Sequence, residues 1–343
     1  MLVTNTTSNT RCIKTANMMN TSNETAVIDP SYLLIADYAK IYLTTLASIS
    51  VVLGLPGNSL VVLVHIQIKD KLVTDWMIFY LAVCDLLSLA VLPSVCIQVL
   101  GYWPIGFPDI LCKLHLWHSN AVSMAAYMFC ACTAMERFVK VCFSKDLFSQ
   151  RQAQFIWIPI SITCYGLGIL AYVTVGNNPN GHCMIDLDQA ALSAIAYGSV
   201  MVVAFISSGV MVLCYIGIGL FLLRTMKELT ASKTNDSFAK RYKSTIQMTK
   251  MLAIVTTVFL LSANIPYISS FITTVQLMHD EPAVSIMFML SMGFMVNNFF
   301  NPYLYLGMST SFRRRALAVV RPCCCCISEY AVTDESTKTT KSS

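Results

Sequence analysis

Residues 41–68 read IYLTTLASISVVLGLPGNSLVVLVHIQI, a run of 28 residues that contains no Asp, Glu, Lys or Arg. A helix needs roughly 20 predominantly apolar residues to cross the hydrocarbon core of a bilayer, so this run can span a membrane. The whole chain has the same character, because 56% of its 343 residues are hydrophobic and only 12% are charged. Soluble domains carry about a quarter charged residues. The composition therefore predicts an integral membrane protein.

Six further windows of the same kind follow along the chain. They cover residues 76–102, 114–135, 152–175, 189–223, 251–278 and 282–312. Asp85 is the one side chain among Asp, Glu, Lys and Arg that falls inside the seven windows. The expected fold is an all-α membrane protein, a seven-transmembrane helix bundle over residues 38–312. Residues 1–37 lack the apolar core of a cleavable signal peptide, so the first span is expected to act as its own insertion signal.

The distribution of charge predicts how the chain is oriented. With the N-terminus outside, the inner segments hold 19 basic and nine acidic residues, and the outer segments hold four basic and eight acidic ones. Basic residues accumulate on the cytoplasmic side of membrane proteins. We therefore expect a multi-pass plasma-membrane protein with an extracellular N-terminus, and the net charge of +5 gives no reason to expect a nucleic-acid partner. Asn5, Asn20 and Asn23 each begin an Asn-x-Ser/Thr acceptor, which predicts glycosylation of the tail over residues 1–37.

Asp85 lies near the middle of the second span. A carboxylate at that depth costs at least about 2.5 kcal/mol on insertion scales, so it should face the interior and find partners. Asn58 in the first span and Asn297, Asn298 and Asn301 in the seventh lie at compatible depths. Two interpretations remain open: an inert protonated acid, or a hydrated polar cluster that could bind a sodium ion and change between two helix arrangements.

Glu136-Arg137-Phe138 ends the third span at the inner boundary of the membrane. The arginine could pair with the adjacent glutamate in a resting state, or leave it and reach a partner protein. The alternative is the ordinary positive charge that flanks a span on its inner side.

Asn301-Pro302-Tyr303-Leu304-Tyr305 lies in the seventh span. Pro302 removes a backbone hydrogen bond and kinks the helix, and Asn301 can supply side-chain hydrogen bonds near the break. The motif predicts a hinge close to Asp85.

Seven motifs occur in order, one in each span. They are Gly57-Asn58, Leu81-Ala-x-x-Asp85, Glu136-Arg137-Phe138, Trp157, Tyr215, Pro266 and Asn301-Pro-x-x-Tyr305. The ordered set resembles the rhodopsin-like (class A) G-protein-coupled receptors over residues 38–322, and it is most similar to the peptide-binding members.

This resemblance implies a receptor, not an enzyme, that binds an extracellular ligand and activates a heterotrimeric G protein, with arrestin and a receptor kinase as further partners. It implies that Arg137, Tyr215 and Tyr305 form a switch that opens a cytoplasmic cleft. It also implies a disulfide between Cys112 and Cys183. The full predicted switch comprises Asp85, Glu136, Arg137, Tyr215, Asn264, Pro266, Asn297, Asn301, Pro302 and Tyr305.

The sixth span departs from the family pattern. The family usually has an aromatic residue before the proline, where this chain has Ala263-Asn264-Ile265-Pro266, and it has Leu260 where a phenylalanine is common. Ser207 replaces the usual proline of the fifth span, and Tyr127 replaces a small aliphatic residue of the third. The usual aromatic trigger is thus absent as a set, and Asn264 is expected to act as a hydrogen-bonding substitute.

Third-span residues at helical spacing are expected to line a ligand pocket. Ser119 stands where amine receptors carry an aspartate, and Met295 stands where an opsin needs a lysine. The acidic outer loops, and Trp103 in a segment that resembles the first outer loop of peptide-binding members, favour a peptide; a small non-amine chemosensory molecule is the alternative. The predicted ligand contacts are Gln98, Trp103, His115, Ser119, Ser123, Asp186, Tyr197, Asn264, Tyr267 and Phe271.

The segment after the seventh span predicts contact with membrane lipid. Residues 313–322 are expected to form an amphipathic helix in the interface, with Phe312, Ala316, Leu317 and Val320 on its apolar face. Residues 323–343 form a Ser/Thr-rich tail in which phosphorylation would add the charge that arrestin recognises. The juxtamembrane cysteines Cys323, Cys324, Cys325 and Cys326 are palmitoylation candidates.

A membrane transporter is the rival from another functional class. Transporters carry internal repeats or several intramembrane charges along a path. This sequence shows no internal repeat and only one embedded acid, which favours a receptor.

Overall fold

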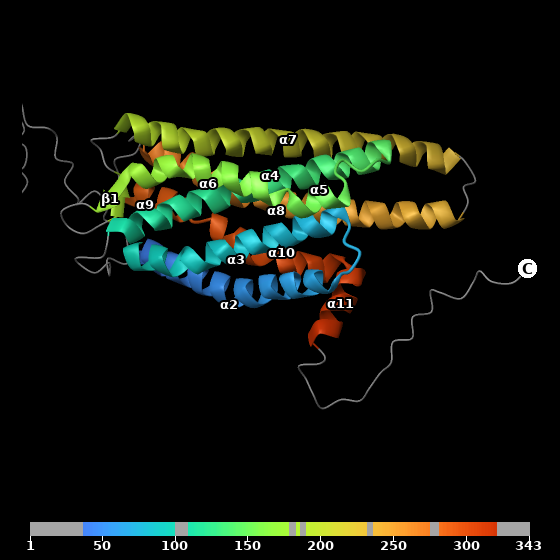
Figure 1. Ribbon diagram of the computed structural model, residues 1–343, viewed down its shortest axis with the longest axis horizontal. Helices are drawn as coiled ribbons and strands as arrows, with labels where there is room; N and C mark the ends of the chain where they lie inside the picture. Colours follow the sequence, from blue (N-terminus) through green and yellow to red (C-terminus); the bar gives the residue numbers. More distant parts are fainter. Residues whose placement is uncertain are drawn as a thin grey trace, which may run out of the picture.

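The computed structural model describes residues 37–99, 109–177, 183–185, 190–231, 236–274 and 281–320. In this part of the chain the long helices lie side by side in one elongated bundle (Figure 1). The helices are α2 (Asp37–Gln67), α3 (Val73–Val99), α4 (Asp109–Phe143), α5 (Gln150–Phe155), α6 (Trp157–Val173), α7 (Ala190–Ala231), α8 (Asp236–Thr274), α9 (Glu281–Ser291), α10 (Phe294–Met308) and α11 (Thr310–Val320). The predicted seven-helix membrane fold with a short helix after the last span is confirmed.

Each predicted apolar window corresponds to helix in the structure. Five spans are long and apolar enough to cross a membrane by themselves within the described residues: 37–67, 73–93, 150–170, 198–225 and 246–269. The third span, α4, is more polar because Lys113, His115 and His118 lie near its start and Glu136 and Arg137 near its end. The seventh span is divided into α9 and α10, neither of which is long enough alone.

The break between α9 and α10 lies at Met292 and Gly293. Here the backbone amides of Gly293 and Met295 bond to carbonyls three residues earlier, Leu290 and Met292, instead of four. A Cβ atom at Gly293 would lie only 3.1 Å from the Leu290 carbonyl oxygen. The tight turn therefore favours glycine, because a side chain at this position would require the Leu290 carbonyl to shift.

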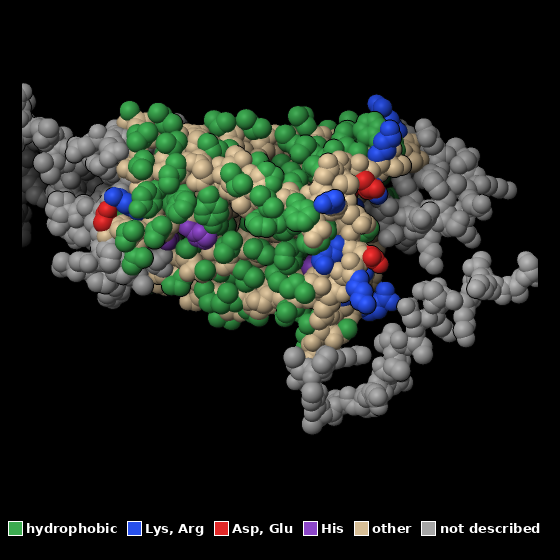
Figure 2. Space-filling view, in the orientation of Figure 1, with side chains coloured by type: hydrophobic (Ala, Val, Ile, Leu, Met, Phe, Trp, Pro, Cys, Tyr) green, Lys and Arg blue, Asp and Glu red, His purple; other side chains and the backbone are tan. Residues whose placement is uncertain are grey.

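The outer surface of the bundle is suited to lipid. Large exposed side chains over the spans are apolar, for example Val52, Ile162 and Leu213. Figure 2 shows apolar side chains over the middle of the visible face and Lys and Arg side chains gathered at one end. That end carries α11, and we call it the α11 end.

The opposite end carries a short antiparallel hairpin, and we call it the hairpin end. Strand β1 (Val175–Asn177) pairs with β2 (Cys183–Ile185), with Val175 opposite Ile185. Both strands contact α4. The sequence analysis did not predict this hairpin, because three-residue strands leave no recognisable alternation.

Helix α11 begins earlier than predicted, at Thr310 instead of Arg313, because α10 already ends at Met308. Ser309 has an extended backbone between the two helices, and its hydroxyl accepts a hydrogen bond from the Phe312 amide at 3.1 Å. Of the predicted apolar face, Phe312 and Ala316 are buried against the bundle, and Leu317 and Val320 are exposed. The apolar face is thus divided between protein and lipid.

Helices α2 and α10 approach each other closely through small residues of α2. A Cβ atom at Gly54 would lie 2.9 Å from the Asn298 carbonyl oxygen, and one at Gly57 would lie 3.0 Å from the Pro302 ring. The close approach lets the Asn58 amide donate to the Asn298 carbonyl at 2.7 Å. Gly54 and Gly57 therefore allow α10 to be held against α2 by hydrogen bonds.

We predict that Gly54→Ala lowers the stability of the bundle by about 1–3 kcal/mol, the usual cost of overpacking. The measurement is thermal unfolding of purified protein in detergent. Gly209→Ala on α7 is the matched control, because a Cβ atom there meets nothing within 4 Å. Equal melting temperatures for the two variants would contradict the packing argument.

Candidate functional site

Asp85 on α3 is buried, with 1% of its surface exposed, and it has partners on α10. Asn301 donates to one carboxylate oxygen at 3.0 Å, and Asn297 donates to the other at 3.5 Å. Asn301 also donates to the Asn297 side-chain oxygen at 3.5 Å. We call these three residues the Asp85 cluster. The Asp85 carboxylate therefore receives its hydrogen bonds from the helix that carries the Pro302 kink.

Two of the predicted partners of Asp85, Asn58 and Asn298, interact with each other instead of with its carboxylate. Asn58 donates to the backbone carbonyls of Gly54 and Asn298, at 3.1 and 2.7 Å. Asn298 takes part through that carbonyl. Asn58 therefore holds the backbone of α10 in place, while Asn297 and Asn301 contact the carboxylate.

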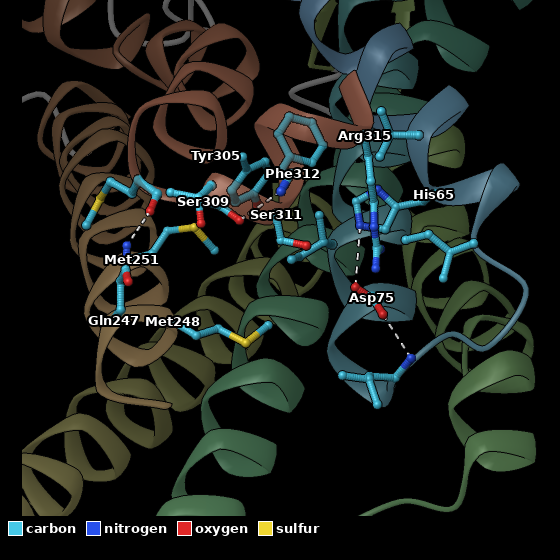
Figure 3. A pocket seen from close by; sticks show the side chains of 16 residues that line it. His65, Asp75, Gln247, Met248, Met251, Tyr305, Ser309, Ser311, Phe312 and Arg315 are labelled. Atoms are coloured by element: carbon cyan, nitrogen blue, oxygen red, sulfur yellow. Dashed lines mark hydrogen bonds and ion pairs between the residues drawn. The ribbon is translucent and has the colours of Figure 1, made fainter. Parts of the chain in front are cut away.

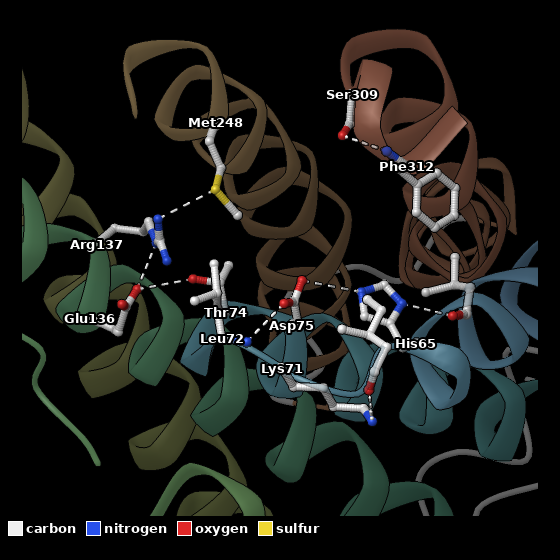
Figure 4. Close-up of polar contacts among 12 residues, drawn as sticks. His65, Lys71, Leu72, Thr74, Asp75, Glu136, Arg137, Met248, Ser309 and Phe312 are labelled. Carbon is white, nitrogen blue, oxygen red and sulfur yellow. Dashed lines mark hydrogen bonds and ion pairs between the residues drawn. The ribbon is translucent and has the colours of Figure 1, made fainter. Parts of the chain in front are cut away.

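Glu136 and Arg137 form a buried ion pair at the α11 end of α4, with 2.6 Å between the Arg137 Nε and a Glu136 carboxylate oxygen. Thr74 on α3 donates to the same carboxylate oxygen at 3.4 Å. The Arg137 guanidinium also contacts the Met248 sulfur of α8 at 3.5 Å (Figure 4). The arginine therefore lies between its own helix and α8, and the contact to α8 is a weak one to a neutral thioether.

Tyr215 and Tyr305 lie on helices near Arg137, but neither is hydrogen-bonded to it among the described residues. The Tyr215 hydroxyl accepts from Thr256 of α8 at 3.3 Å, which joins α7 to α8. The Tyr305 hydroxyl is buried without a partner in the described part of the chain. The structure therefore does not bring the three predicted switch residues into one contact.

A cavity of about 240 Å³ lies at the α11 end between α2, α3, α8, α10 and α11. Tyr305, Phe312, Met251 and Arg315 are among its lining residues (Figure 3). Gln247 of α8 donates to the Met308 carbonyl of α10 at 3.0 Å beside this cavity. Two polar contacts, Arg137–Met248 and Gln247–Met308, therefore join the α11 half of α8 to α4 and α10.

His65 and Asp75 form a second polar pair on the wall of this cavity. The ring nitrogen Nε2 of His65 lies 3.9 Å from the Asp75 carboxylate, and Nδ1 lies 2.7 Å from the Val61 carbonyl oxygen. Asp75 also accepts from the Leu72 amide at 2.9 Å. This pair joins the end of α2 to the start of α3, and the sequence analysis did not single out either residue.

Hydrogen bonds also join α4, α7 and α8 in the hairpin half of the bundle. Asn264 of α8 accepts from the Tyr127 hydroxyl of α4 at 3.1 Å, and it exchanges hydrogen bonds with Ser208 of α7 at 3.0 and 3.1 Å. Nearer the hairpin end, the hydroxyls of Ser123 and Tyr267 are 2.8 Å apart. Three predicted ligand contacts, Ser123, Asn264 and Tyr267, therefore lie in one region between α4 and α8.

The structure describes only some of the other predicted ligand contacts. His115 and Ser119 lie on the α4 turns before Ser123, toward the hairpin end, and both are partly exposed. Trp103 and Asp186 lie outside the described residues. The same holds for the side chains of Gln98, Tyr197 and Phe271, which lie on α3, α7 and α8.

Cys112 is buried in the first turn of α4 and is disulfide-bonded. Its predicted partner Cys183 begins strand β2, which contacts α4, but the Cys183 side chain lies outside the described residues. The pairing of the two therefore stays a prediction. The acceptors Asn5, Asn20 and Asn23 and the cysteines Cys323, Cys324, Cys325 and Cys326 also lie outside the described residues.

Several contacts were not anticipated. The Tyr127 ring packs edge-on against Phe259 with 4.8 Å between ring centroids, so α8 does supply an aromatic partner, one residue before Leu260. Ser208 and Thr256 likewise take part in hydrogen bonds between α7 and α8, and Met248 contacts Arg137 of α4. The sequence carried a signal for Tyr127, which departs from the family pattern, but none for these partners.

We predict that Asn301→Ala destabilises the bundle by about 1–3 kcal/mol, because it leaves the buried Asp85 carboxylate with only its longer contact. Thermal unfolding in detergent measures the effect. Asn297→Ala is the matched control on the same helix, since its contact to Asp85 is 0.5 Å longer. If both variants unfold at the same temperature, the 3.0 Å hydrogen bond contributes no more to stability than the 3.5 Å one.

Comparison with known protein families agrees with this arrangement. Residues 57–305 match the family described as 7 transmembrane receptor (rhodopsin family). The matched region begins at Gly57 of α2 and ends at Tyr305 of α10, so it contains the Asp85 cluster, Arg137 and Asn264. Members of this family are receptors, which confirms the prediction that the chain is not an enzyme. Since the match covers well over half of the 343 residues, the chain belongs to the rhodopsin family of seven-transmembrane receptors.

Proposed function

We propose that this receptor lies in the plasma membrane with its hairpin end outside, binds an extracellular peptide between α4, α7 and α8, and activates a heterotrimeric G protein at its α11 end. The observation that carries the proposal is the buried Arg137, held at the α11 end of α4 between Glu136 and α8. A charge kept almost out of contact with water is costly unless it is paired, so a change that separates α8 from α4 would make this group available to a partner.

The orientation rests on the distribution of charge. The α11 end carries the basic side chains seen together in Figure 2, and the sequence segments predicted to be inside hold 19 of the 23 Lys and Arg residues if the N-terminus is outside. Basic residues favour the cytoplasmic side. The glycosylation acceptors Asn5, Asn20 and Asn23 would then be extracellular, and Cys323 to Cys326 would follow α11 at the inner interface, where palmitate can be attached.

The proposed movement uses the prolines of two helices. Pro266 in α8 and Pro302 in α10 are both buried, and each removes a backbone hydrogen bond. The α11 half of α8 is held by Gln247, which makes a neutral hydrogen bond, and by Met248, whose sulfur is only a weak acceptor for the Arg137 guanidinium. Neither contact joins two charged groups, so α8 can leave α4 at modest cost. Tyr215 and the unpaired hydroxyl of Tyr305 would then become partners for the released arginine.

A peptide is favoured as the ligand over a small chemosensory molecule. Ser119 and Ser123 of α4 are uncharged, so neither offers a counter-ion to a protonated amine, and acidic residues such as Asp186 occur in the outer loops. Arrestin and a receptor kinase are proposed as further partners of the phosphorylated tail. The family membership favours this receptor function over the transporter alternative.

We also propose that the Asp85 cluster binds a sodium ion. Asp85 supplies a buried carboxylate, and the Asn301 side-chain oxygen is buried without a partner among the described residues. A carboxylate together with amide oxygens is a donor set that suits a hard cation. The ion would neutralise Asp85 and favour the arrangement in which α3 and α10 are joined.

We predict that Arg137→Ala abolishes G-protein activation while surface expression and ligand binding are largely retained. The measurement uses cells that express promiscuous G proteins and a library of amidated neuropeptides. Arg151→Ala on α5 is the matched control, because Arg151 is an exposed basic residue at the same end. Undiminished signalling by Arg137→Ala would refute the role assigned to this residue.

We predict that sodium stabilises the purified wild-type receptor but not Asp85→Asn. At a tenfold excess over the dissociation constant, the gain is about 1.4 kcal/mol. It is measured as a rise in the melting temperature when sodium replaces N-methylglucamine at constant ionic strength. An equal rise in both proteins would show that the salt acts elsewhere.

A further inference from the structure

Asn264 is the point at which three helices share one partly buried amide group. It lies on α8 two residues before Pro266, and it bonds to Tyr127 of α4 and Ser208 of α7. We call these three residues the Asn264 cluster. Each pair among α4, α7 and α8 is also in contact through other residues, and the three helices run alongside one another in Figure 1.

Tyr127 is held rigidly in this cluster. Only 1% of its surface is exposed, and its ring lies between two rings of α8. The centroid of Phe259 is 4.8 Å away and that of Tyr267 is 5.9 Å away. The Tyr127 hydroxyl therefore reaches Asn264 only while α8 keeps its present rotation relative to α4.

The Asn264 cluster occurs together with a closed arrangement of the α11 end, by which we mean that α8 contacts α4 there. In the same structure Arg137 is paired with Glu136 and contacts Met248. Asn264 lies on the α11 side of Pro266, so it belongs to the part of α8 that would move if the helix bends there. Movement of this part relative to α4 or α7 stretches at least one of the hydrogen bonds to Asn264.

The cluster is also connected to the predicted ligand region. The Ser123 hydroxyl is hydrogen-bonded to Tyr267, whose ring contacts Tyr127. A ligand that displaces Ser123 or Tyr267 would therefore shift Tyr127. The shift would remove its hydrogen bond to Asn264 without any direct contact between the ligand and Asn264.

We propose that Tyr127, Ser208 and Asn264 form a hydrogen-bonded lock that stabilises the closed arrangement of α8, and that the ligand opens the receptor by displacing Tyr127. Tyr127 and Ser208 are positioning residues in this proposal. It rests on the proposed ligand-activated function, since the lock is what ligand binding releases. A merely structural polar cluster would instead stabilise open and closed arrangements alike.

The test measures the position of α8 directly. Spin labels are placed at Arg151 of α5 and Lys250 of α8, two exposed positions at the α11 end, and electron resonance gives the distance distribution in lipid nanodiscs. The labels are attached through unnatural amino acids, because several cysteines of the chain are free. No ligand or G protein is needed, so the result does not depend on identifying either.

We expect Tyr127→Phe to raise the ratio of open to closed receptor about threefold, the effect of losing one average hydrogen bond inside a membrane protein. Ser208→Ala removes both hydrogen bonds between Ser208 and Asn264 and is expected to raise the ratio at least as much. Tyr165→Phe is the matched control, because it removes a 2.8 Å hydrogen bond between α6 and α4 that does not involve α8. Ser208→Ala keeps the test valid if Tyr127→Phe does not fold.

An unchanged distance distribution in both variants would overturn the lock, and so would an equal change in Tyr165→Phe. Failure of the proposed function looks different: the wild-type receptor would activate no G protein, whereas the distances in the variants would still report on the lock. If the distances change while Arg137→Ala signals normally, the lock stands and the role of Arg137 does not.

Discussion

The structure depends on one constraint, which is that a polar group in the hydrocarbon core finds its partner inside the bundle or remains unpaired at high cost. Asp85 illustrates it most simply, because its carboxylate is satisfied by amides of α10. These bonds, together with that of Asn58 to the Asn298 carbonyl, hold α10 against α2 and α3. Polar side chains therefore determine which helices are joined, and apolar packing fills the space between them. Because few polar contacts join the helices, the loss of any one hydrogen bond can change how two helices are arranged.

The sequence predicted the features that follow from depth and length alone. Apolar windows gave the seven spans, and the depth of Asp85 in its span gave the expectation of partners such as Asn301. Ser309 was not recognised as the break before α11, since a serine in an apolar window gives no local signal of an extended backbone. The division of the seventh span at Gly293 was missed for a similar reason, because its hydrogen bonds depend on a local turn of the chain.

The contacts among α4, α7 and α8 could not be predicted for a different reason. Which side chains meet between two helices depends on their relative rotation and shift, and apolar periodicity in a membrane helix says little about either when lipid and core are equally apolar. Tyr127 and Asn264 were both noted as departures from the family pattern. Their pairing requires that Tyr127 be level with Asn264, which only the packed arrangement establishes. Ser208 gave no signal at all, as one of several serines in α7.

These departures compensate for one another. Asn264 is smaller than the aromatic residue expected before the proline of this span, and the Tyr127 ring packs on Phe259 of the same helix. Tyr127 also places its hydroxyl opposite the Asn264 amide, so α4 and α8 are joined here by a hydrogen bond as well as by ring packing. Hydrogen bonds are directional and are lost over a small displacement, whereas apolar contacts weaken gradually. Release of α8 should therefore be more abrupt, and more dependent on the exact position of Tyr127, than in a receptor whose helices are held together by aromatic packing.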